Sequence, residues 1–514
     1  MKKLLLFLLI LAAPGPLLPA WAQLDQMLRL EIDPPKGTDN LIYDVTPIGD
    51  KGLLVSTQPR YTTYGNDNYW TIARYDTSLT QVWEKRFDID KGMQPSQVYQ
   101  DSAFLYVLLT RDESLKFKIF RMDYLTGEHE MIEGSSLTYV YVTDFKVLGN
   151  TAYLGGAVNF RPVVIAFNFL DKRSRVLPAL YEPRSELVGI EIDNTHRVAN
   201  IVVFNAERRQ SRLYLKSFDF MGKITKNLPL ESQKDKTLHT AKITSLNDSE
   251  QFVLGNYTIK NSPYSQGIYL AKLNNNQQEY IKYFRFNDFR SFFDYMKPRR
   301  RERVKNRISR LREKGREMQL HYRFLMHDLI ETKDQYIVVA EAYFPQYRSN
   351  SVYGFYPVGM RGNSYYDRIF DGYRYTHAVV CGFDKSGNLL WDNCFEILDY
   401  KNYQLREIVE VAVEEDKIVL AYPEEGTVHT KVIRGNDVLK SKEKYTIKTN
   451  FENDRVTNAE DASIDHWYGP YFISWGFQEI YNGKDTGVKP NREVFYLNKL
   501  TYHSEASTLL PEQK

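Results

Sequence analysis

The chain has 514 residues with a formal net charge of +3, and 43% of its residues are hydrophobic and 14% aromatic. A chain with 38 Tyr, 28 Phe and 6 Trp can bury enough apolar surface to offset its ordering entropy, which excludes a disordered protein. The 68 basic and 65 acidic residues nearly cancel, so the charge gives no sign of nucleic-acid binding. At about 150 residues per domain the length predicts about three domains, unless the chain is built from repeats.

The first 22 residues have the pattern of a signal peptide. Two lysines precede an apolar run over 4–13, a Pro-Gly-Pro break follows at 14–16, and Ala20-Trp21-Ala22 fits the site that signal peptidase cleaves. An uncleaved anchor is the alternative, but the run is too short to span a bilayer, and no later stretch is long and apolar enough. We therefore expect an exported protein without a transmembrane segment in the mature chain, in the periplasm or associated with the outer membrane or cell surface.

The most informative pattern is a unit of about 40 to 50 residues that recurs along the chain. Two copies, 72–83 and 379–391, share an Asp, a tight turn and a Trp, and a third copy at 120–129 lacks the Trp. Asp with Gly or Ser favours the turn, and the aromatic ring is expected to clamp the next strand. Two more strand-like runs precede each signature, so each unit predicts four short strands.

Quartets of strand-like runs can be drawn along most of the chain. They fall at 41–88, 97–133, 139–182, 186–232, 238–287, 322–398 and 403–449. The last unit, 461–503, offers only three strands, and Leu28–Asp33 is a candidate for the fourth. An N-terminal strand that completed the last sheet would close a ring and remove a sheet edge.

These quartets predict an all-β fold in a single domain over 23–514. The expected architecture is an eight-bladed β-propeller of four-stranded antiparallel blades, closed by the N-terminal strand and carrying a helical insertion. Seven blades are an alternative, because the weaker repeats lack the signature. A large two-domain β-sandwich is the rival architecture.

The Asp–turn–Trp signature resembles the pyrroloquinoline-quinone-like and WD40-like propeller repeats of bacterial envelope proteins. The resemblance covers two full copies and one partial copy, and it implies a fold rather than a chemistry. That superfamily includes quinoprotein dehydrogenases and non-catalytic scaffolds of outer-membrane assembly. The quinone enzymes use adjacent cysteines over the cofactor, whereas Cys381 and Cys394 are thirteen positions apart, which disfavours a quinone enzyme.

An insertion at 288–320 interrupts the repeats. Pro298 suits a helix start, and 299–318 predicts a helix with a narrow apolar stripe formed by Val304, Ile308, Leu311 and Met318. Basic residues surround this stripe: Lys297, Arg299, Arg300, Arg301, Arg303, Lys305, Arg307, Arg310, Arg312, Lys314 and Arg316. Either the stripe docks on the propeller and the arginines pair with acids elsewhere, or the helix is attracted to an anionic surface.

A second insertion, at 344–376, is predicted as a long Tyr-rich loop. Its candidate partner-binding residues are Tyr347, Tyr353, Phe355, Tyr356, Tyr365, Tyr366 and Tyr373. Rigid amphipathic Tyr rings are favoured at protein contacts, and a packed cover over the propeller edge is the alternative.

The two cysteines, Cys381 and Cys394, flank a strand–turn–strand pattern. If Gly387-Asn388 forms a two-residue loop, the cysteines face each other, and export would allow a disulfide. A four-residue loop would instead place Cys381 opposite Asp392, and two buried thiols are then expected.

No catalytic, cofactor or metal motif is present, so we expect no catalytic residues, no cofactor and no metal. His321 and His327 would share a strand face but are too few for a metal site, and His466 is expected in the lining of the central channel.

The resulting hypothesis is an exported, non-enzymatic scaffold of the bacterial cell envelope, monomeric outside its complex. Its partner would be an envelope protein or an anionic envelope surface, and not nucleic acid. The alternative is an envelope enzyme, a hydrolase or quinone-dependent, with its site in the central channel. Converging carboxylates in that channel would favour the enzyme, and an apolar plug would favour the scaffold.

Overall fold

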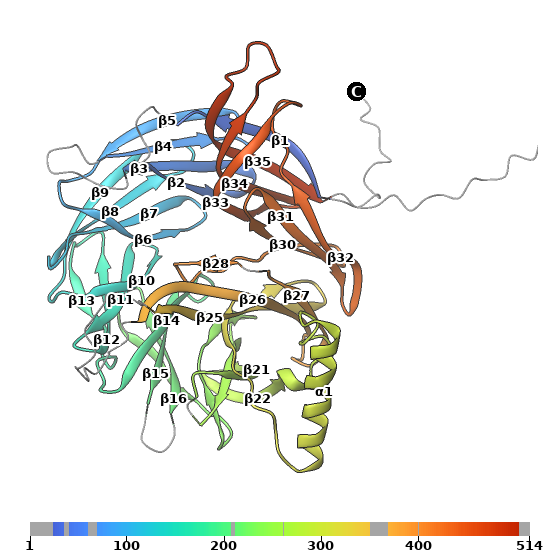
Figure 1. Cartoon of the computed structure of the whole chain (residues 1–514). Coiled ribbons are helices and arrows are strands. Elements are labelled where there is room, and N and C mark those ends of the chain that lie inside the picture. The colour runs from blue at the N-terminus through green and yellow to red at the C-terminus, as the bar shows by residue number, and fades with distance from the viewer. Residues whose placement is uncertain are drawn as a thin grey trace, which may run out of the picture.

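The computed structural model describes residues 24–34, 41–59, 69–206, 211–260, 262–349, 368–398 and 400–502. The predicted signal peptide lies outside these ranges. Eight antiparallel sheets stand around a common axis, which confirms the eight-bladed β-propeller (Figure 1). Among the described residues, no helix combines the length and the apolar character that a membrane crossing needs.

The first four blades follow the chain order. Blade 1 contains β2 (Leu41–Pro47), η1 (Gly49–Lys51), β3 (Leu53–Pro59), β4 (Tyr69–Tyr75) and β5 (Gln81–Asp88). Blade 2 contains β6 (Gln94–Gln100), β7 (Phe104–Thr110), β8 (Lys116–Asp123) and β9 (His129–Ser135). Blade 3 contains β10 (Tyr141–Leu148), β11 (Thr151–Val158), β12 (Arg161–Asn168) and β13 (Ser174–Val176). Blade 4 contains β14 (Ser185–Asp193), β15 (Val198–Asn205), β16 (Arg212–Asp219) and β17 (Ile224–Leu230).

The remaining four blades carry the insertions and the closure of the ring. Blade 5 contains β18 (Lys236–Leu238), β19 (Lys242–Ser245), β20 (Glu250–Ile259) and β21 (Ser265–Asn274), with β22 (Gln277–Arg285). The segment η2 (Phe286–Asp288) and helix α1 (Pro298–Glu313) follow. Blade 6 contains β23 (Arg323–Met326), β24 (Ile330–Glu331), β25 (Gln335–Ser349), β26 (Arg368–Asp384), β27 (Leu389–Glu396) and β28 (Lys401–Asn402). Blade 7 contains β29 (Glu410–Glu414), β30 (Lys417–Glu424), β31 (Thr427–Arg434) and β32 (Asp437–Thr446), and blade 8 contains β33 (Arg455–Tyr468), β34 (Tyr471–Tyr481), β35 (Asn491–Tyr502) and β1 (Leu24–Ile32).

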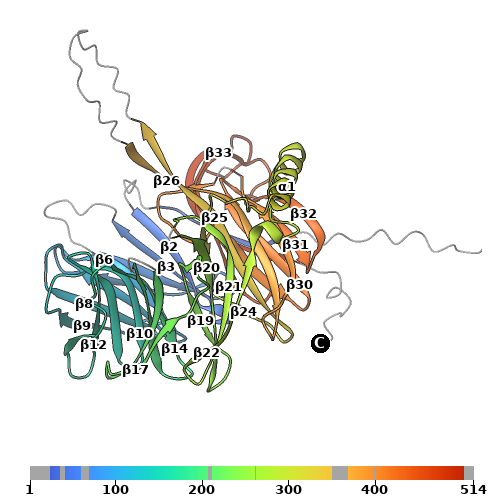
Figure 2. The ribbon, with the colours of Figure 1, turned by 90° about the horizontal axis from the view of Figure 1, so that it is seen from below.

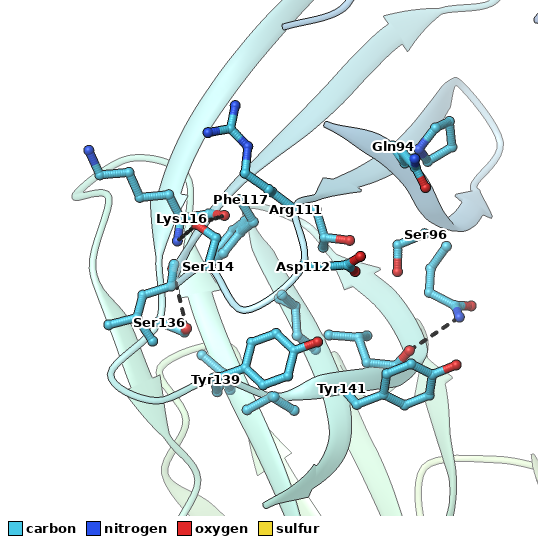
Figure 3. Close-up of a pocket in the computed structure, with 18 of the residues that line it drawn as sticks. Gln94, Ser96, Arg111, Asp112, Ser114, Lys116, Phe117, Ser136, Tyr139 and Tyr141 are labelled. Atoms are coloured by element: carbon cyan, nitrogen blue, oxygen red, sulfur yellow. Dashed lines mark hydrogen bonds between the residues drawn. The ribbon is translucent and has the colours of Figure 1, made fainter. Parts of the chain in front are cut away.

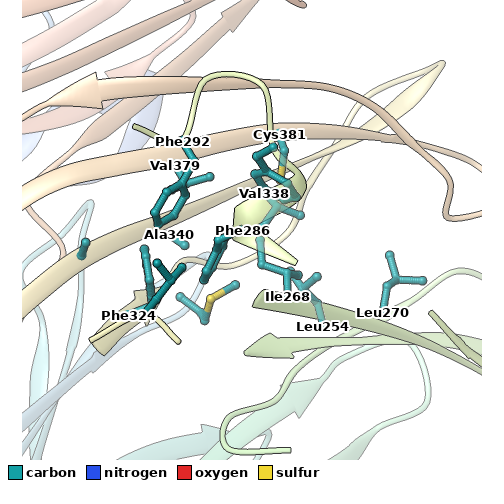
Figure 4. Close-up of a cluster of buried hydrophobic side chains, with 14 of the residues drawn as sticks. Leu254, Ile268, Leu270, Phe286, Phe292, Phe324, Val338, Ala340, Val379 and Cys381 are labelled. Carbon is teal, nitrogen blue, oxygen red and sulfur yellow. The ribbon is translucent and has the colours of Figure 1, made fainter. Parts of the chain in front are cut away.

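The apolar runs of the sequence become the middle strands of the blades, because both faces of such a strand are covered by neighbouring blades. In β7 five consecutive residues are buried, whereas in β5 at the outer edge every residue except Phe87 is exposed or partly covered. The hydrophobic core is therefore divided into clusters between adjacent blades. One of them, between blades 5 and 6, joins Phe286, Phe292 and Phe324 to Val338 and Cys381 (Figure 4).

The Asp turns form as the sequence predicts. The Asp76 carboxylate accepts hydrogen bonds from the backbone N–H groups of Ser78 and Thr80, and Asp123 and Asp384 cap their own turns in the same way. The indole of Trp83 donates to the carbonyl of Leu125 in the next blade, at 3.0 Å. Trp83 thus ties blade 1 to blade 2, whereas the indole of Trp391 donates to the side chain of Gln335 within its own blade, at 2.8 Å.

The N-terminal strand closes the ring, as predicted. β1 pairs antiparallel with β35, and on β1 the side chains of Arg29 and Glu31 form an ion pair at 2.8 Å. Glu31 lies 3.2 Å from Nε of Arg492, and Arg492 also donates to both carboxylate oxygens of Asp454, whose side chain has no exposed surface. A network of buried charges therefore supplements the backbone hydrogen bonds at the closure.

The cysteines follow the register of the longer loop. Cys381 lies opposite Asp392, Val379 lies opposite Cys394, and both thiols are free and buried. The cross-strand disulfide is therefore not formed. Burial raises the pKa of Cys394 to about 12 and the pKa of Cys381 well above its ordinary value, so both thiols stay protonated and unreactive.

Candidate functional site

Carboxylates from most of the blades converge on the axial channel. The first strand of each blade is the innermost one, and β6, β10, β14 and β19 are successive neighbours, as are β29, β33 and β2. These strands and the loops before them supply the acids of the channel: Asp44, Asp144, Glu191, Asp328, Glu407, Glu410 and Asp465. The described part of the channel is therefore lined with carboxylates.

His327 and Glu341 form the most buried pair of this lining. Nε2 of His327 lies 2.8 Å from the Glu341 carboxylate, which also accepts the backbone N–H groups of Ile408 (2.9 Å) and Val409 (2.8 Å). Burial alone would lower the pKa of His327, but Glu341 and the nearby Glu407 outweigh it, so the pKa lies above its ordinary value. The pair ties blade 6 to the chain that enters blade 7.

Asp465 faces two other carboxylates. Burial raises the pKa of Asp465 to about 8, and repulsion from Glu410 and Asp44 adds to this, while Arg406 opposes it. Burial also raises the pKa of Glu410, although its carboxylate accepts the backbone N–H of His466 at 3.1 Å. Burial thus favours the protonated form of Asp465, and this carboxyl lies beside two other carboxyls whose pKa values burial also raises, so the three can share protons.

Lys242 of blade 5 lies between carboxylates of blades 4 and 6. Its ammonium lies 2.8 Å from Asp328 and 3.4 Å from Glu191. Burial opposes its charge, but the two carboxylates prevail and the pKa of Lys242 lies above its ordinary value. A cavity of about 510 Å³ opens here, and its wall also includes Arg323 and Tyr343.

A second cavity, of about 380 Å³, lies at the rim between blades 2 and 3 (Figure 3). Arg111, Ser96, Tyr139 and Tyr141 stand around it, and Asp112 is the one carboxylate in its wall. This polar hollow has no acid–base cluster comparable to that of the channel.

His466 bonds the Glu410 carboxylate through its backbone N–H, while Nε2 of its ring lies 2.8 Å from the Gly469 carbonyl and the ring packs against Phe472. His321 and His327 do not come together, because His321 packs edge-on against Tyr264. Within the described ranges no three His, Cys, Asp or Glu side chains are grouped to hold a metal ion.

Replacing Asp465 with Asn is expected to stabilise the protein at alkaline pH. Below about pH 4 the carboxyl is protonated in the folded and unfolded chains alike, so the variant and the wild type should be about equally stable. Above about pH 4 the unfolded wild type releases the proton of Asp465, whereas the folded wild type keeps it until the pH passes its raised pKa of about 8. The folded wild type therefore loses stability relative to the unfolded chain as the pH rises. Channel water screens part of the repulsion, so we expect the variant to be more stable by roughly 2 kcal/mol at pH 9.

Urea unfolding at pH 4 and at pH 9 measures this difference. Asp461→Asn is the control, because Asp461 is exposed on the same strand, β33. A gain in the free energy of unfolding that is equal at both pH values, or equal in the two variants, would contradict the raised pKa of Asp465.

The second candidate site is the hairpin of blade 6. β25 and β26 are the two longest strands of the described chain, and their outer halves project beyond the propeller (Figure 2). The prediction of a loop over 344–376 is therefore wrong at both ends of this range, because β25 continues to Ser349 and β26 begins at Arg368. The register Tyr343↔Tyr375 to Ser349↔Arg368 continues the sheet pairing, which satisfies the backbone groups of these residues.

Aromatic side chains are exposed on this projection. We call Phe344 (41% exposed), Tyr347 (53%), Phe370 (37%), the half-buried Tyr373 and the adjoining Tyr403 (58%) the hairpin patch. The rings of Tyr347 and Phe370 lie 5.9 Å apart, and those of Phe370 and Tyr373 lie 5.0 Å apart. β28 pairs with β26 where the projection leaves the blade, and there Nζ of Lys401 lies 3.2 Å from the carboxylate of the buried Asp371. The other candidates, Tyr353, Phe355, Tyr356, Tyr365 and Tyr366, lie outside the described residues.

Helix α1 stands at the outer rim of the ring (Figure 1). It ends at Glu313, and not at 318 as predicted, because Gly315 adopts a left-handed backbone (φ +65°). Arg316 N–H then bonds the carbonyl of Leu311 and Gly315 N–H that of Arg312, which closes the helix.

One face of α1 docks as the apolar stripe predicts. Ile308 is buried in the cluster between blades 5 and 6, and Val304 and Met318 pack against the same cluster. Two of the predicted basic residues, Arg301 and Arg312, turn to the body of the protein. Arg301 lies 2.8 Å from Asp294, and Arg312 pairs with Asp288.

No protein-family profile and no curated protein sequence matches the chain. Among solved structures it is similar to Sqt1 from Chaetomium thermophilum, with a TM-score of 0.42 and 10% identity over 94% of this chain and 100% of that one. It is similar to polysaccharide lyase Uly1 with a TM-score of 0.39 and 8% identity over 93% and 99% of the two chains. For the β-propeller domain of the Trilobed protease from Pyrococcus furiosus the values are 0.34 and 10% over 78% and 100%. The eight sheets of the chain itself identify it as a β-propeller.

Proposed function

We propose that the protein is an exported, non-enzymatic scaffold that binds an envelope protein through the hairpin patch of blade 6. The observation that carries this proposal is the extension of β25 and β26 beyond the propeller with exposed aromatic rings on it. A strand pair that served only the blade would end where the sheet ends.

The chemistry of the patch supports a protein partner. Tyr and Phe rings offer large contact areas at low entropic cost, and such residues dominate the binding energy of protein interfaces. Leaving several of them together in water is unfavourable unless a partner covers them. The ion pair of Lys401 with Asp371 braces the projection, so the patch is held in place before binding.

Replacing Tyr347 and Phe370 with Ser is expected to weaken partner binding at least roughly tenfold, because each ring removed is a candidate hot spot. Capture from envelope extracts with immobilised wild type and variant, followed by titration of the retained protein, measures the effect. The control is Tyr141→Ser with Phe160→Ser, since these rings are 71% and 97% exposed on blade 3. Equal retention by both variants and the wild type would contradict the proposal.

The second candidate function is that of a hydrolase with its site in the channel, and the converging carboxylates favour it. Asp465 would act as the acid and Glu410 as the base, according to their different environments. We rank it second because several groups are engaged in bonds between blades, such as Glu341 with the backbone N–H of Ile408 and Lys242 with Asp328. Both free thiols are buried in the core, which gives no support to a quinone enzyme.

An activity screen that compares hydrolysis by the wild type with that by Asp465→Asn and by Glu410→Gln tests this second function. Hydrolysis that is lost in both variants and retained in the Tyr347→Ser, Phe370→Ser variant would establish the channel as the active site.

A further inference from the structure

The cations on and next to α1 differ in their surroundings: Lys305 donates to the backbone carbonyl of Arg290, and Arg300 is exposed on the flank of the helix. Arg301 and Arg312 pair with acids of the protein body, on the side of the helix that carries the buried Ile308. Four cations of α1 and the residue that caps its C-terminus form a separate line, and all five are exposed with no acidic partner among the described residues: Arg299, Arg303, Arg307, Arg310 and Lys314. We call these five the cationic stripe.

The spacing of the cationic stripe aligns its members along the helix. Steps of four, four, three and four residues keep them on one line, because an α-helix has 3.6 residues per turn. At about 1.5 Å per residue the line is roughly 22 Å long. Glu302 and Glu313 lie on the flank beside the stripe and not within it, at the steps taken by Asn306 and Ser309. The line is thus continuous in positive charge.

The stripe offers charge without apolar anchors. None of the residues of α1, all of which are described, is an exposed large hydrophobic, and Ile308, the apolar side chain of its docked face, is buried. A protein interface would need a desolvated core of aromatic or aliphatic side chains, and single-stranded nucleic acid would need rings for stacking. A flat array of anions needs neither of these features.

We propose that the cationic stripe binds the anionic phospholipid headgroups of a membrane surface, with α1 lying flat on the headgroups and not inserted among the acyl chains. This surface is independent of the hairpin patch and of the partner proposed for it. Each cation near such a surface adds to the attraction, and the attraction falls with ionic strength. Because Ile308 and the paired arginines hold α1 on the propeller, the stripe is oriented before it meets the membrane.

Co-sedimentation of the full chain with vesicles tests this proposal. The wild type should bind vesicles of phosphatidylcholine mixed with phosphatidylglycerol, ignore phosphatidylcholine alone, and be released by high salt. The variant Arg303→Gln, Arg307→Gln, Arg310→Gln should bind the mixed vesicles roughly tenfold more weakly or worse. The control variant Lys91→Gln, Lys172→Gln, Lys223→Gln removes the same charge from exposed sites on other blades and should bind as the wild type does.

Three results would overturn the proposal. The first is equal vesicle binding by the stripe variant and the wild type, and the second is equal weakening in the stripe and control variants. The third is wild-type protein that ignores the mixed vesicles but retains double-stranded DNA or an acidic peptide, which would assign the stripe to another class of partner. All variants change exposed side chains, and matching thermal unfolding confirms that each is folded.

Discussion

Replacing Asp454 with Ala is expected to lower the free energy of unfolding by about 3 kcal/mol, because the Arg492 guanidinium loses its hydrogen bonds to Asp454 and keeps only Glu31 as an acidic partner. The side chain of Asp454 has no exposed surface, the Arg492 side chain is 8% exposed, and Arg492 donates to both oxygens of Asp454. The same arginine reaches Glu31 on β1, so the loss occurs where the first and last strands close the ring. A ring that loses its closure exposes two sheet edges at once.

Urea unfolding at neutral pH measures this loss. The control is Asp485→Ala, because Asp485 bonds the same Asn482 but has no arginine partner among the described residues, and a far smaller loss is expected. Burial opposes ionisation of Asp454, but hydrogen bonds from Arg492 and Asn482 outweigh it and hold its pKa below the ordinary value. The difference between wild type and variant should therefore shrink as the pH falls below about 4. Equal losses in the two variants would contradict the role of the closure network.

The second large effect is expected for Phe286→Ala. Phe286 is fully buried, and its ring lies 4.5 Å from Phe324, 4.8 Å from Phe292 and 5.6 Å from Phe289. Removing it leaves a cavity that this dense cluster can only partly fill, which costs about 3 to 5 kcal/mol. The same cluster holds Ile308, so α1 should open more often.

Two measurements follow this substitution. Urea unfolding reports the overall loss, and trypsin digestion reports the opening of α1, whose arginines are the cleavage sites. Phe160→Ala is the control, since Phe160 is 97% exposed and should change neither result. If Phe286→Ala lowered stability while the rate of cleavage within α1 stayed that of the wild type, the cluster would not be what anchors the helix.

The blades could be predicted because their signals are local. An uninterrupted apolar run predicts a strand that is buried on both faces, as in Phe104-Leu105-Tyr106-Val107-Leu108. The turns at Asp76 and Asp384 indicate the hairpins that join the outer strands. Asp219 caps a turn of the same kind through the N–H groups of Met221 and Lys223, and no Trp follows to mark it. Closure by the N-terminal strand could be inferred because the last unit lacked one strand.

The channel site could not be predicted, because its members are far apart in the sequence. Asp44, Glu410 and Asp465 come from three blades, and their proximity depends on how the blades close into a ring. Nothing local distinguishes Glu341 from other acids of the chain. Two other misses had local signals: Gly315 marks the helix end, and the Tyr residues after 343 and before 375 fit continued strands.

The proposed binding role of the hairpin patch is tested most directly by photo-crosslinking in the cells that make the protein. The photoreactive residue p-benzoyl-phenylalanine would replace Tyr347 in one chain and Tyr141 in another, both exposed tyrosines. The account predicts a discrete adduct with one envelope protein from position 347 and none from position 141. No adduct at 347, or the same adducts from both positions, would contradict it.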